Sequence, residues 1–570
     1  MIIERHLVYC NFEHAIFNFY ILMSSLSVNH RVSLLKKLSS EEYDLLVIGG
    51  GITGAGIALD AASRGIKTAL VEKQDFAAGT SSRSTKLIHG GLRYLKQLEI
   101  GLVREVGRER AIVHDNAPHL VVPEKMLLAL IESGTYVKLA TSFGLWIYDL
   151  LAGVKQEDRR KMLSKKQTSE TEPLLRKDIL RGGGLYVEYR TDDARLTLEI
   201  IKTASKYGAD VINYYEAKNF KYEKNKIAGL GCEDLLSHNI FTVRAKQIVN
   251  ATGPWVDMLR KNDGSLKGKR LHLTKGVHLV VPREKFPIKQ SVYFDVPDGR
   301  MMFAIPRGNI TYFGTTDTDY TGSLEHPVVT RKDADYLLHA VNFMFPGIKL
   351  SVGDIISSWA GLRPLIHEEG RSPSELSRKD EIFISESGLI SIAGGKLTGY
   401  RKMAERVVDL VIKNLHQSPS FAKAECKTGN ITISGGEFQK PELVKDYIQQ
   451  VFQKIRSWNL GEDRAEYLVR TYGRQTDFII EKFKEFKDTD AEIALARAEL
   501  WFAVNNESVF HLQDFFVRRT GRLYFEVQTI LKLLPALLPD IKNYLGWNEH
   551  QAEAEKKALE KAVDEATDFR

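Results

Sequence analysis

The sequence contains few cysteines and none of the common cysteine or histidine patterns of metal sites. Cys10, Cys232 and Cys426 are the three cysteines among 570 residues, and no two of them form a Cys-x-x-Cys pair. A secreted domain stapled by disulfides would carry more cysteines, so we expect a reduced, intracellular protein. Since neither His-Glu-x-x-His nor a paired cysteine spacing occurs, we expect no metal site.

Long apolar runs are also absent. No stretch of about eighteen apolar residues occurs, which excludes a membrane-spanning helix. The most apolar short stretch, residues 15–23, is too short to span a bilayer, and no small-residue cleavage site follows it. Because Met23, Ser24 and Ser25 can themselves begin a protein, we expect translation to start at Met23. An additional helix that touches a membrane is the alternative.

A strong charge of one sign is lacking as well. The 80 lysines and arginines against 73 acidic residues leave a formal charge of +7, which is modest for this length. We therefore expect no nucleic-acid partner. The surplus permits a weak attraction to an anionic membrane, although solvated surface lysines would give the same sum.

The length of 570 residues predicts two or three domains. Glycine-rich strand ends occur near residues 44–93, 247–254 and 389–400, so the chain between them must leave one sheet and return to it. We predict an α/β fold in which a Rossmann-like FAD-binding domain and a substrate domain with a mixed or antiparallel sheet interleave over residues 41–415. An N-terminal extension (1–40) precedes them, and an all-α domain (416–570) follows.

A dinucleotide-binding pattern defines the first of these strand ends. A predicted strand at residues 43–48 runs into Gly49, Gly51 and Gly54, and a second strand at 67–71 delivers Glu72. The glycines permit a tight turn, close approach of a pyrophosphate and close packing of the next helix, whose N-terminus faces the phosphates. Glu72 is expected to bind the adenosine ribose and to disfavour NADP, but this pattern alone does not separate FAD from NAD.

Further glycine- and hydroxyl-rich segments favour FAD. Residues 79–94 form a long cradle directly after Glu72, which suits the extended diphosphate and ribityl chain of FAD but serves no purpose for NAD. Two later strands end at residues 251–255 and 394–398, the latter before a helix that would stabilise negative charge at a reduced flavin. The remaining predicted FAD contacts are Thr80, Ser81, Ser82, Lys86, Leu87, Gly90, Gly91, Ala251, Gly253, Gly395, Leu397 and Thr398.

Five separate blocks resemble the FAD-dependent, quinone-linked glycerol-3-phosphate dehydrogenases of bacterial type. They are residues 84–95, 191–196, 272–276, 361–365 and 394–401, and the resemblance extends over roughly residues 44–522. One departure is Gly399, which stands where a second threonine is expected and removes one hydroxyl contact.

The resemblance implies oxidation of sn-glycerol 3-phosphate to dihydroxyacetone phosphate, with electrons passing through FAD to a membrane quinone. The protein would then lie peripherally on the cytoplasmic face of the cell membrane, and it could form a homodimer. An oxidase that passes electrons to oxygen is the close alternative. A flavin-binding module without redox turnover is an alternative of another class.

The matching blocks also imply roles for individual residues. Arg363 and Arg378 resemble the cationic clamp for the substrate phosphate, a task that suits the planar fork of arginine. His278 is the first choice for the base that removes the hydroxyl proton, because an imidazole pKa near the working pH fits that role, and His89 is the second. Arg93, Tyr94 and Thr316 are expected to contact substrate, and Lys396 is expected to add positive charge near the flavin.

Overall fold

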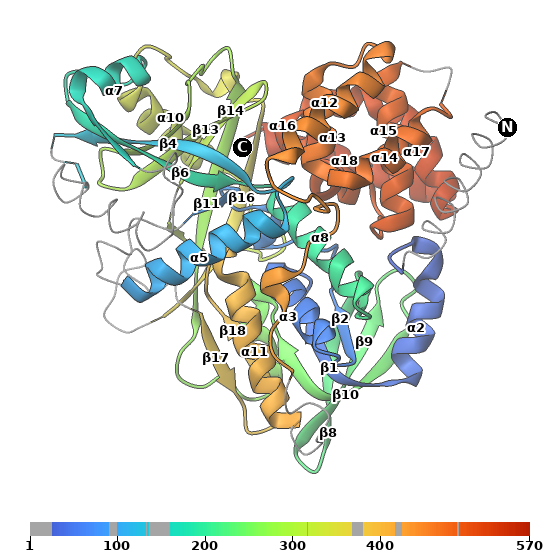
Figure 1. Ribbon diagram of the computed structural model, residues 1–570. Coiled ribbons are helices and arrows are strands. Elements are labelled where there is room, and N and C mark those ends of the chain that lie inside the picture. The colour runs from blue at the N-terminus through green and yellow to red at the C-terminus, as the bar shows by residue number, and fades with distance from the viewer. Residues whose placement is uncertain are drawn as a thin grey trace.

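The computed structural model describes residues 25–89, 100–132, 134–135, 160–315, 317–367, 380–415, 424–486 and 490–569. Figure 1 shows three bodies: a sheet covered by helices at the bottom, a second sheet at the upper left and a helical body at the upper right. Among these described residues, no helix is long and apolar enough to cross a bilayer.

The lower body contains an eight-stranded sheet with the strand order β17-β18-β10-β1-β2-β7 and a β8–β9 pair added beside β10. The central strands β18, β10, β1, β2 and β7 are parallel, as in a Rossmann-like fold. Its strands are β1 (Glu42–Ile48), β2 (Thr68–Val71), β7 (Asp210–Ile212), β8 (Tyr215–Glu223), β9 (Lys226–Asp234), β10 (Ile240–Asn250), β17 (Glu381–Ile384) and β18 (Ile390–Ala393). Its helices are α2 (Arg31–Ser40), α3 (Ile52–Ser63), α8 (Asp193–Lys206), α9 (Val256–Asn262) and α11 (Tyr400–Leu415).

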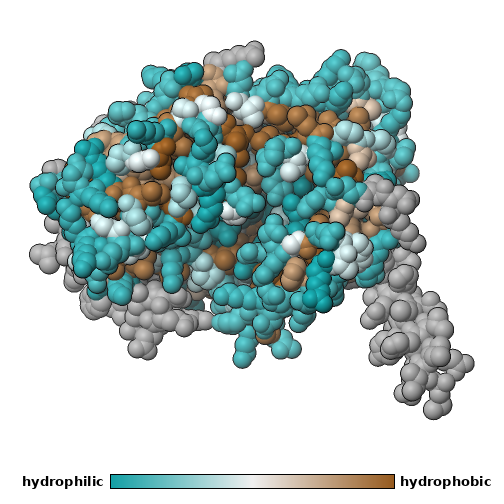
Figure 2. Space-filling model, turned by 90° about the horizontal axis from the view of Figure 1, so that it is seen from above, coloured by the Kyte–Doolittle hydropathy of each residue, from teal (hydrophilic) through white to brown (hydrophobic). Residues whose placement is uncertain are grey.

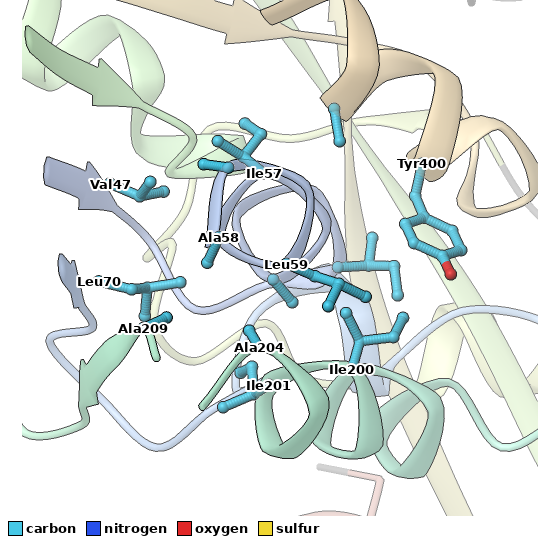
Figure 3. Packing of buried hydrophobic residues seen from close by; sticks show 14 of the residues in the cluster. Val47, Ile57, Ala58, Leu59, Leu70, Ile200, Ile201, Ala204, Ala209 and Tyr400 are labelled. Atoms are coloured by element: carbon cyan, nitrogen blue, oxygen red, sulfur yellow. The ribbon is translucent and has the colours of Figure 1, made fainter. Parts of the chain in front are cut away.

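Small and branched apolar residues hold the helices against this sheet. Ala58 and Leu59 of α3 lie between Leu70 of β2 and Ile200 of α8, and all four side chains are almost fully buried (Figure 3). The alanines and glycines of α3 leave room for close packing, so the helix N-terminus is held directly behind the end of β1.

The upper left body is a ten-stranded mixed sheet with the order β15-β11-β14-β13-β12-β4-β6-β3, in which β16 pairs with β11 and β5 with β6. Its pairs are antiparallel except for the parallel pair of β12 and β4. Its strands are β3 (Leu87–Ile88), β4 (Val122–Ile131), β5 (Lys161–Ser164), β6 (Leu180–Arg190), β11 (Leu271–Pro282), β12 (Ser291–Asp295), β13 (Met301–Arg307), β14 (Ile310–Gly314), β15 (Thr318–Asp319) and β16 (Ser357–Ile366). Its helices are α5 (Ile100–Asn116), α7 (Lys165–Thr171) and α10 (Arg331–Met344).

The chain leaves the first sheet for the second and returns to it twice, which confirms the predicted interleaving. It leaves the first sheet after β2, returns through α8 to β7, leaves again after α9 and returns at β17. As a result, the carboxyl ends of β1, β10 and β18 meet beside the inner part of the second sheet, where a ligand would contact both.

The described residues from 424 onward contain no strand, in agreement with the predicted helical domain. The helices are α12 (Leu443–Ile455), α13 (Glu462–Tyr472), α14 (Thr476–Phe483), α15 (Ala491–Asn506), α16 (Arg522–Phe525), α17 (Val527–Leu545) and α18 (Glu549–Thr567), together with a π-helix, η11 (Asp514–Arg519). Tyr524 and Trp359 share a hydrophobic cluster, so this domain packs directly on β16 of the second sheet.

In the described part of the predicted extension, residues 25–40, helix α2 packs on the first sheet. Leu35 and Leu38 of α2 are buried in the cluster that also holds Tyr43 and Ile248, and the Arg31 guanidinium donates to the Asn213 carbonyl over 2.9 Å. This helix therefore belongs to the FAD-binding domain rather than to a separate extension. Residues 15–23 and Met23 lie outside the described residues.

Candidate active site

Two adjoining cavities lie where the sheets meet. The first cavity, of about 390 Å³, is formed mainly by the ends of β1, β2, β10 and β18. The second cavity, of about 570 Å³, is lined by residues of the second sheet, among them residues of β11 and β16, and by the turn after β18. They share lining residues, among them Thr80, Lys396 and Leu397. Predicted residues that line the first are Gly49, Gly51, Glu72, Thr80, Ser81, Ala251, Gly253, Gly395, Lys396 and Leu397; those that line the second include Leu87, His89, His278, Arg363 and Thr398.

The glycines of the first cavity fit the backbone approach that a pyrophosphate needs. Gly49 has φ of +112°, and a Cβ there would lie 2.6 Å from the Ala251 carbonyl oxygen. A Cβ on Gly54 would lie 1.9 Å from the Gly49 carbonyl oxygen, so this residue serves helix packing and lines neither cavity. Gly51 is the N-cap of α3 and faces the cavity, so the helix N-terminus is directed at the space that phosphates would fill.

Glu72 is buried with its carboxylate already oriented. It accepts hydrogen bonds from the backbone N–H groups of Gly50 and Gln74 over 2.6 and 2.8 Å. Burial raises the pKa of Glu72, and these two bonds oppose that shift. The glycine cradle, the helix N-terminus and a fixed acid at the end of β2 together fit the pyrophosphate and ribose of FAD.

The hydroxyl-rich segment after Glu72 contributes only part of the predicted contacts. Ser81 accepts from the Ile52 N–H over 2.9 Å, and Thr80 donates to the Leu362 carbonyl over 2.7 Å; both line the first cavity. Ser82 and Lys86 line neither cavity. The buried Lys86 ammonium instead forms an ion pair with Asp193 at 2.5 Å.

His278 lies in β11, and its side chain is almost fully buried at the second cavity. Its ring stacks on Trp359 with a centroid separation of 4.8 Å, and Nε2 lies 3.0 Å from the Thr85 hydroxyl. Burial, and then the charges of Arg363 and Lys86, lower the pKa of His278 well below its ordinary value. The ring is therefore neutral in the free protein. The sequence led us to expect a pKa near the working pH for His278, and burial instead lowers this pKa.

Arg363 lies on β16 at the mouth of the second cavity, with its guanidinium over Gly276 of β11. A Cβ on Gly276 would lie 2.8 Å from Nη2 of Arg363, so a side chain there would displace the guanidinium. Nη1 donates to the Asp317 carboxylate over 2.5 Å, which holds the guanidinium in place. Its side chain remains 27% exposed, so an anionic ligand can reach it.

The other predicted site residues divide into two groups. His89 and Lys396 line the second cavity; the His89 ring contacts Phe303 edge to face at 5.9 Å, and its carbonyl accepts from the Thr398 hydroxyl over 3.2 Å. Gly90, Gly91, Arg93, Tyr94, Thr316 and Arg378 lie outside the described residues.

Several lining residues were missed from the sequence. Arg83 and Arg300 add two cations to the second cavity, and Thr85 and Asp317 also line it. Thr85 belongs to the segment 84–95 that carries the family resemblance. Its place at the site depends on the pairing of β11 with β16, which brings His278 opposite Trp359 from a distant part of the chain. No local spacing signals such a contact.

Comparisons with known proteins agree with this geometry. Residues 44–401 match the family described as FAD dependent oxidoreductase, and residues 426–552 match the family described as C-terminal domain of alpha-glycerophosphate oxidase. The chain is 51% identical over 548 residues to the aerobic glycerol-3-phosphate dehydrogenase of Bacillus subtilis (strain 168), covering 95% of this chain and 99% of the relative. The enzyme of the same name from Staphylococcus aureus (strain USA300) is 49% identical over 95% of this chain and 98% of the relative.

A solved structure shows the same arrangement of domains. The glycerol-3-phosphate dehydrogenase from Bacillus halodurans, complexed with FAD, superposes with a TM-score of 0.82 at 44% identity, over 95% of this chain and 99% of that one. The L-alpha-glycerophosphate oxidase from Mycoplasma pneumoniae has a TM-score of 0.53 at 18% identity, over 65% of this chain and 95% of that one, and shares the fold alone.

The fold and the glycine-lined cavity thus define an FAD-dependent oxidoreductase. Within that class, the chain belongs to the family of FAD-dependent glycerol-3-phosphate dehydrogenases. It is therefore an enzyme, and the alternative of a flavin-binding module without redox turnover is not supported.

Proposed function

We propose that the protein oxidises sn-glycerol 3-phosphate to dihydroxyacetone phosphate. The main support is the second cavity, which adjoins the cofactor cavity. Four cationic side chains, three carboxylates and two histidines line it, and Arg363 is the cation on which the proposal rests. FAD, held by Glu72 and the glycine-rich turns, would accept the hydride from C2 of the substrate. The protein's own residues must then bind the phosphate, orient C2 and receive the hydroxyl proton.

Arg363 is the proposed phosphate ligand among the described residues. Its guanidinium is partly exposed at the cavity and already anchored by Asp317, so only a small change in side-chain entropy accompanies binding. Arg83 and Arg300 line the same cavity, Arg300 as the partner of Asp298, which also lines it. Arg378 and Arg93 remain predictions for the same clamp, and Tyr94 and Thr316 remain predictions for substrate contacts.

His278 is the proposed base, and His89 is the alternative. A neutral, buried imidazole can accept the hydroxyl proton, and the Trp359 ring stacked on it favours the cation that results. Lys396 lines both cavities, and we propose that its charge stabilises negative charge on the reduced cofactor.

We further propose that a membrane quinone removes the electrons and that the protein binds the cytoplasmic face of the cell membrane. The formal charge of +7 suits an anionic lipid surface. Figure 2 shows hydrophobic residues gathered among hydrophilic ones on the face seen from above, and Leu531 of the C-terminal helices is 70% exposed. Oxygen is the second candidate acceptor, because the C-terminal match is to an oxidase family.

Steady-state assays with an artificial acceptor test the proposed substrate. We expect formation of dihydroxyacetone phosphate from glycerol 3-phosphate and far slower oxidation of glycerol, because glycerol cannot use the cationic cavity. Equal turnover of glycerol and its phosphate would rule out a phosphate clamp.

A further inference from the structure

His278 is buried, and its hydrogen-bonding contact among the described residues is made by Nε2. The residue is 1% exposed, and one face of its ring is covered by Trp359. Among the described residues, its buried Nδ1 has no hydrogen-bond partner. Nε2 lies 3.0 Å from the hydroxyl oxygen of Thr85. Thr85 is thus the described side chain that meets Nε2, at the same cavity that His278 lines.

Thr85 and His278 both line the cavity that is available to substrate. Ser84, beside Thr85, also lines this second cavity. The Thr85 carbonyl accepts from the Tyr312 hydroxyl over 3.1 Å, and the Ser84 carbonyl accepts from the Trp359 indole N–H over 3.1 Å. The two aromatic residues that contact the His278 ring thus also hold the backbone of Thr85.

The neighbouring buried ion pair fixes the same segment. Lys86 has φ of +58°, a conformation that a residue with a side chain rarely adopts. Its ammonium contacts one oxygen of Asp193 at 2.5 Å, and the other oxygen accepts from the Ser84 N–H over 2.9 Å. Asp193 therefore holds residues on both sides of Thr85, which explains why Lys86 is buried without lining a cavity.

From this arrangement we propose that Thr85 relays the substrate proton to His278. The inference rests on the proposed function. The Thr85 oxygen accepts the proton of the C2 hydroxyl while its own proton moves to Nε2 of His278. The hydride of C2 goes to bound FAD, so the alcohol becomes a ketone and both electrons are accounted for. Lys86 and Asp193 act as positioning residues.

The charged groups around His278 are compatible with this direction of transfer. Arg363 and Lys86 keep the imidazole neutral in the free enzyme, and Asp193 pairs with Lys86. Substrate phosphate at Arg363 would offset one of the two cations and make His278 more basic when the substrate is present.

Rapid anaerobic mixing of FAD-loaded enzyme with glycerol 3-phosphate tests the relay. Thr85→Val should slow flavin reduction about a hundredfold or more, whereas Thr85→Ser, which keeps the hydroxyl, should stay within about tenfold of the unaltered enzyme. Thr311→Val is the matched control, because Thr311 is buried in the same sheet and donates to the Phe286 carbonyl. Glycerol 3-phosphate should reduce the flavin of Thr311→Val at the same rate as the flavin of the unaltered enzyme.

Two further measurements separate a relay from a structural role. Thr85→Val should retain FAD and bind dihydroxyacetone phosphate with unchanged affinity. In the unaltered enzyme, the solvent deuterium effect on flavin reduction should vary nonlinearly with deuterium content, because more than one proton moves. A linear dependence would overturn the relay even if Thr85→Val does not fold.

The rates of the Thr85 variants can also contradict the relay. Reduction of Thr85→Val at the unaltered rate, or equal losses in the valine and serine variants, would also overturn the relay. If glycerol 3-phosphate fails to reduce the flavin of the unaltered enzyme, the proposed function fails instead.

Discussion

At the residue scale, the cofactor cavity depends on positions that cannot accept a side chain. A Cβ on Gly54 would meet a backbone oxygen at 1.9 Å, so α3 would have to move away from the end of β1. We expect Gly54→Ala to cost about 1–3 kcal/mol of folding free energy and to lower the FAD content. Thermal unfolding and flavin absorbance measure both.

Gly347→Ala is the control for this change, since no atom lies within 4 Å of the added carbon. It should retain its flavin and its stability. Normal flavin content in Gly54→Ala would show that the close packing of α3 is unnecessary.

A second prediction at this scale concerns the phosphate clamp. Arg363→Met keeps an unbranched apolar stem but is shorter and lacks the charge. We therefore expect a loss of about 2 kcal/mol of transition-state stabilisation, which lowers kcat/KM for glycerol 3-phosphate roughly thirtyfold. FAD content should not change. Arg176→Met, which removes a partly exposed arginine paired with Asp178 away from both cavities, should leave kcat/KM unaltered. A similar loss of the activity with glycerol would argue against phosphate recognition by Arg363.

At the scale of elements, a buried ion-pair network joins the C-terminal domain to the cofactor cradle. Asp75 lies between Glu72 and the hydroxyl-rich segment, and it accepts from both terminal nitrogens of Arg519 over 2.7 and 2.8 Å. Arg518, also on the π-helix η11, contacts the same carboxylate. The C-terminal helices thus help to hold the loop that follows the ribose-binding acid.

We expect Asp75→Asn to cost about 1.5–3 kcal/mol of folding free energy, because two buried guanidinium groups lose one counter-charge, although Arg518 keeps Asp514 and Arg519 keeps Glu507 nearby. FAD should also dissociate more readily. Denaturant unfolding and flavin release measure the two effects. Asp178→Asn, at an exposed pair, is the control and should change neither. If Asp75→Asn unfolds at the same denaturant concentration as the unaltered protein, the ion-pair network does not stabilise the fold.

The same carboxylate predicts the acid limit of stability. Burial alone would raise the pKa of Asp75, but the charges of Arg519 and Arg518 outweigh it and lower the pKa to about 2. Since the unfolded value is about 3.9, the stabilisation is fully present above that pH and is lost as the pH falls toward 2. Asp75→Asn should therefore flatten the dependence of unfolding free energy on pH in this window.

The residues that could be predicted from the sequence are fixed by local spacing, whereas the missed contacts depend on which elements pair. Gly49, Gly51, Gly54 and Glu72 could be predicted because a strand, a turn and a helix fix their spacing locally. The contact of Thr85 with His278 joins residues 193 positions apart, and it depends on which strands pair. Lys86 was assigned to FAD because it lies in a hydroxyl-rich segment, whereas its burial with Asp193 could be recognised only in the folded protein.

At the scale of the whole molecule, the proposed quinone acceptor requires that the protein bind a membrane surface. If the protein docks on a membrane, anionic liposomes that contain a quinone should raise turnover more than neutral ones, and salt should reduce the difference. Stopped-flow reoxidation of the substrate-reduced enzyme compares the acceptors directly. Reoxidation by air-saturated buffer at least as fast as by quinone, with stoichiometric hydrogen peroxide, would favour the oxidase.

The most direct test of the central claim is an anaerobic titration of the FAD-loaded protein with glycerol 3-phosphate. We expect the absorbance of the oxidised flavin to disappear in proportion to the added glycerol 3-phosphate, and dihydroxyacetone phosphate to form in equal amount. Glycerol at the same concentration should have little effect on the flavin absorbance. Flavin that stays oxidised in the presence of excess glycerol 3-phosphate would contradict the account.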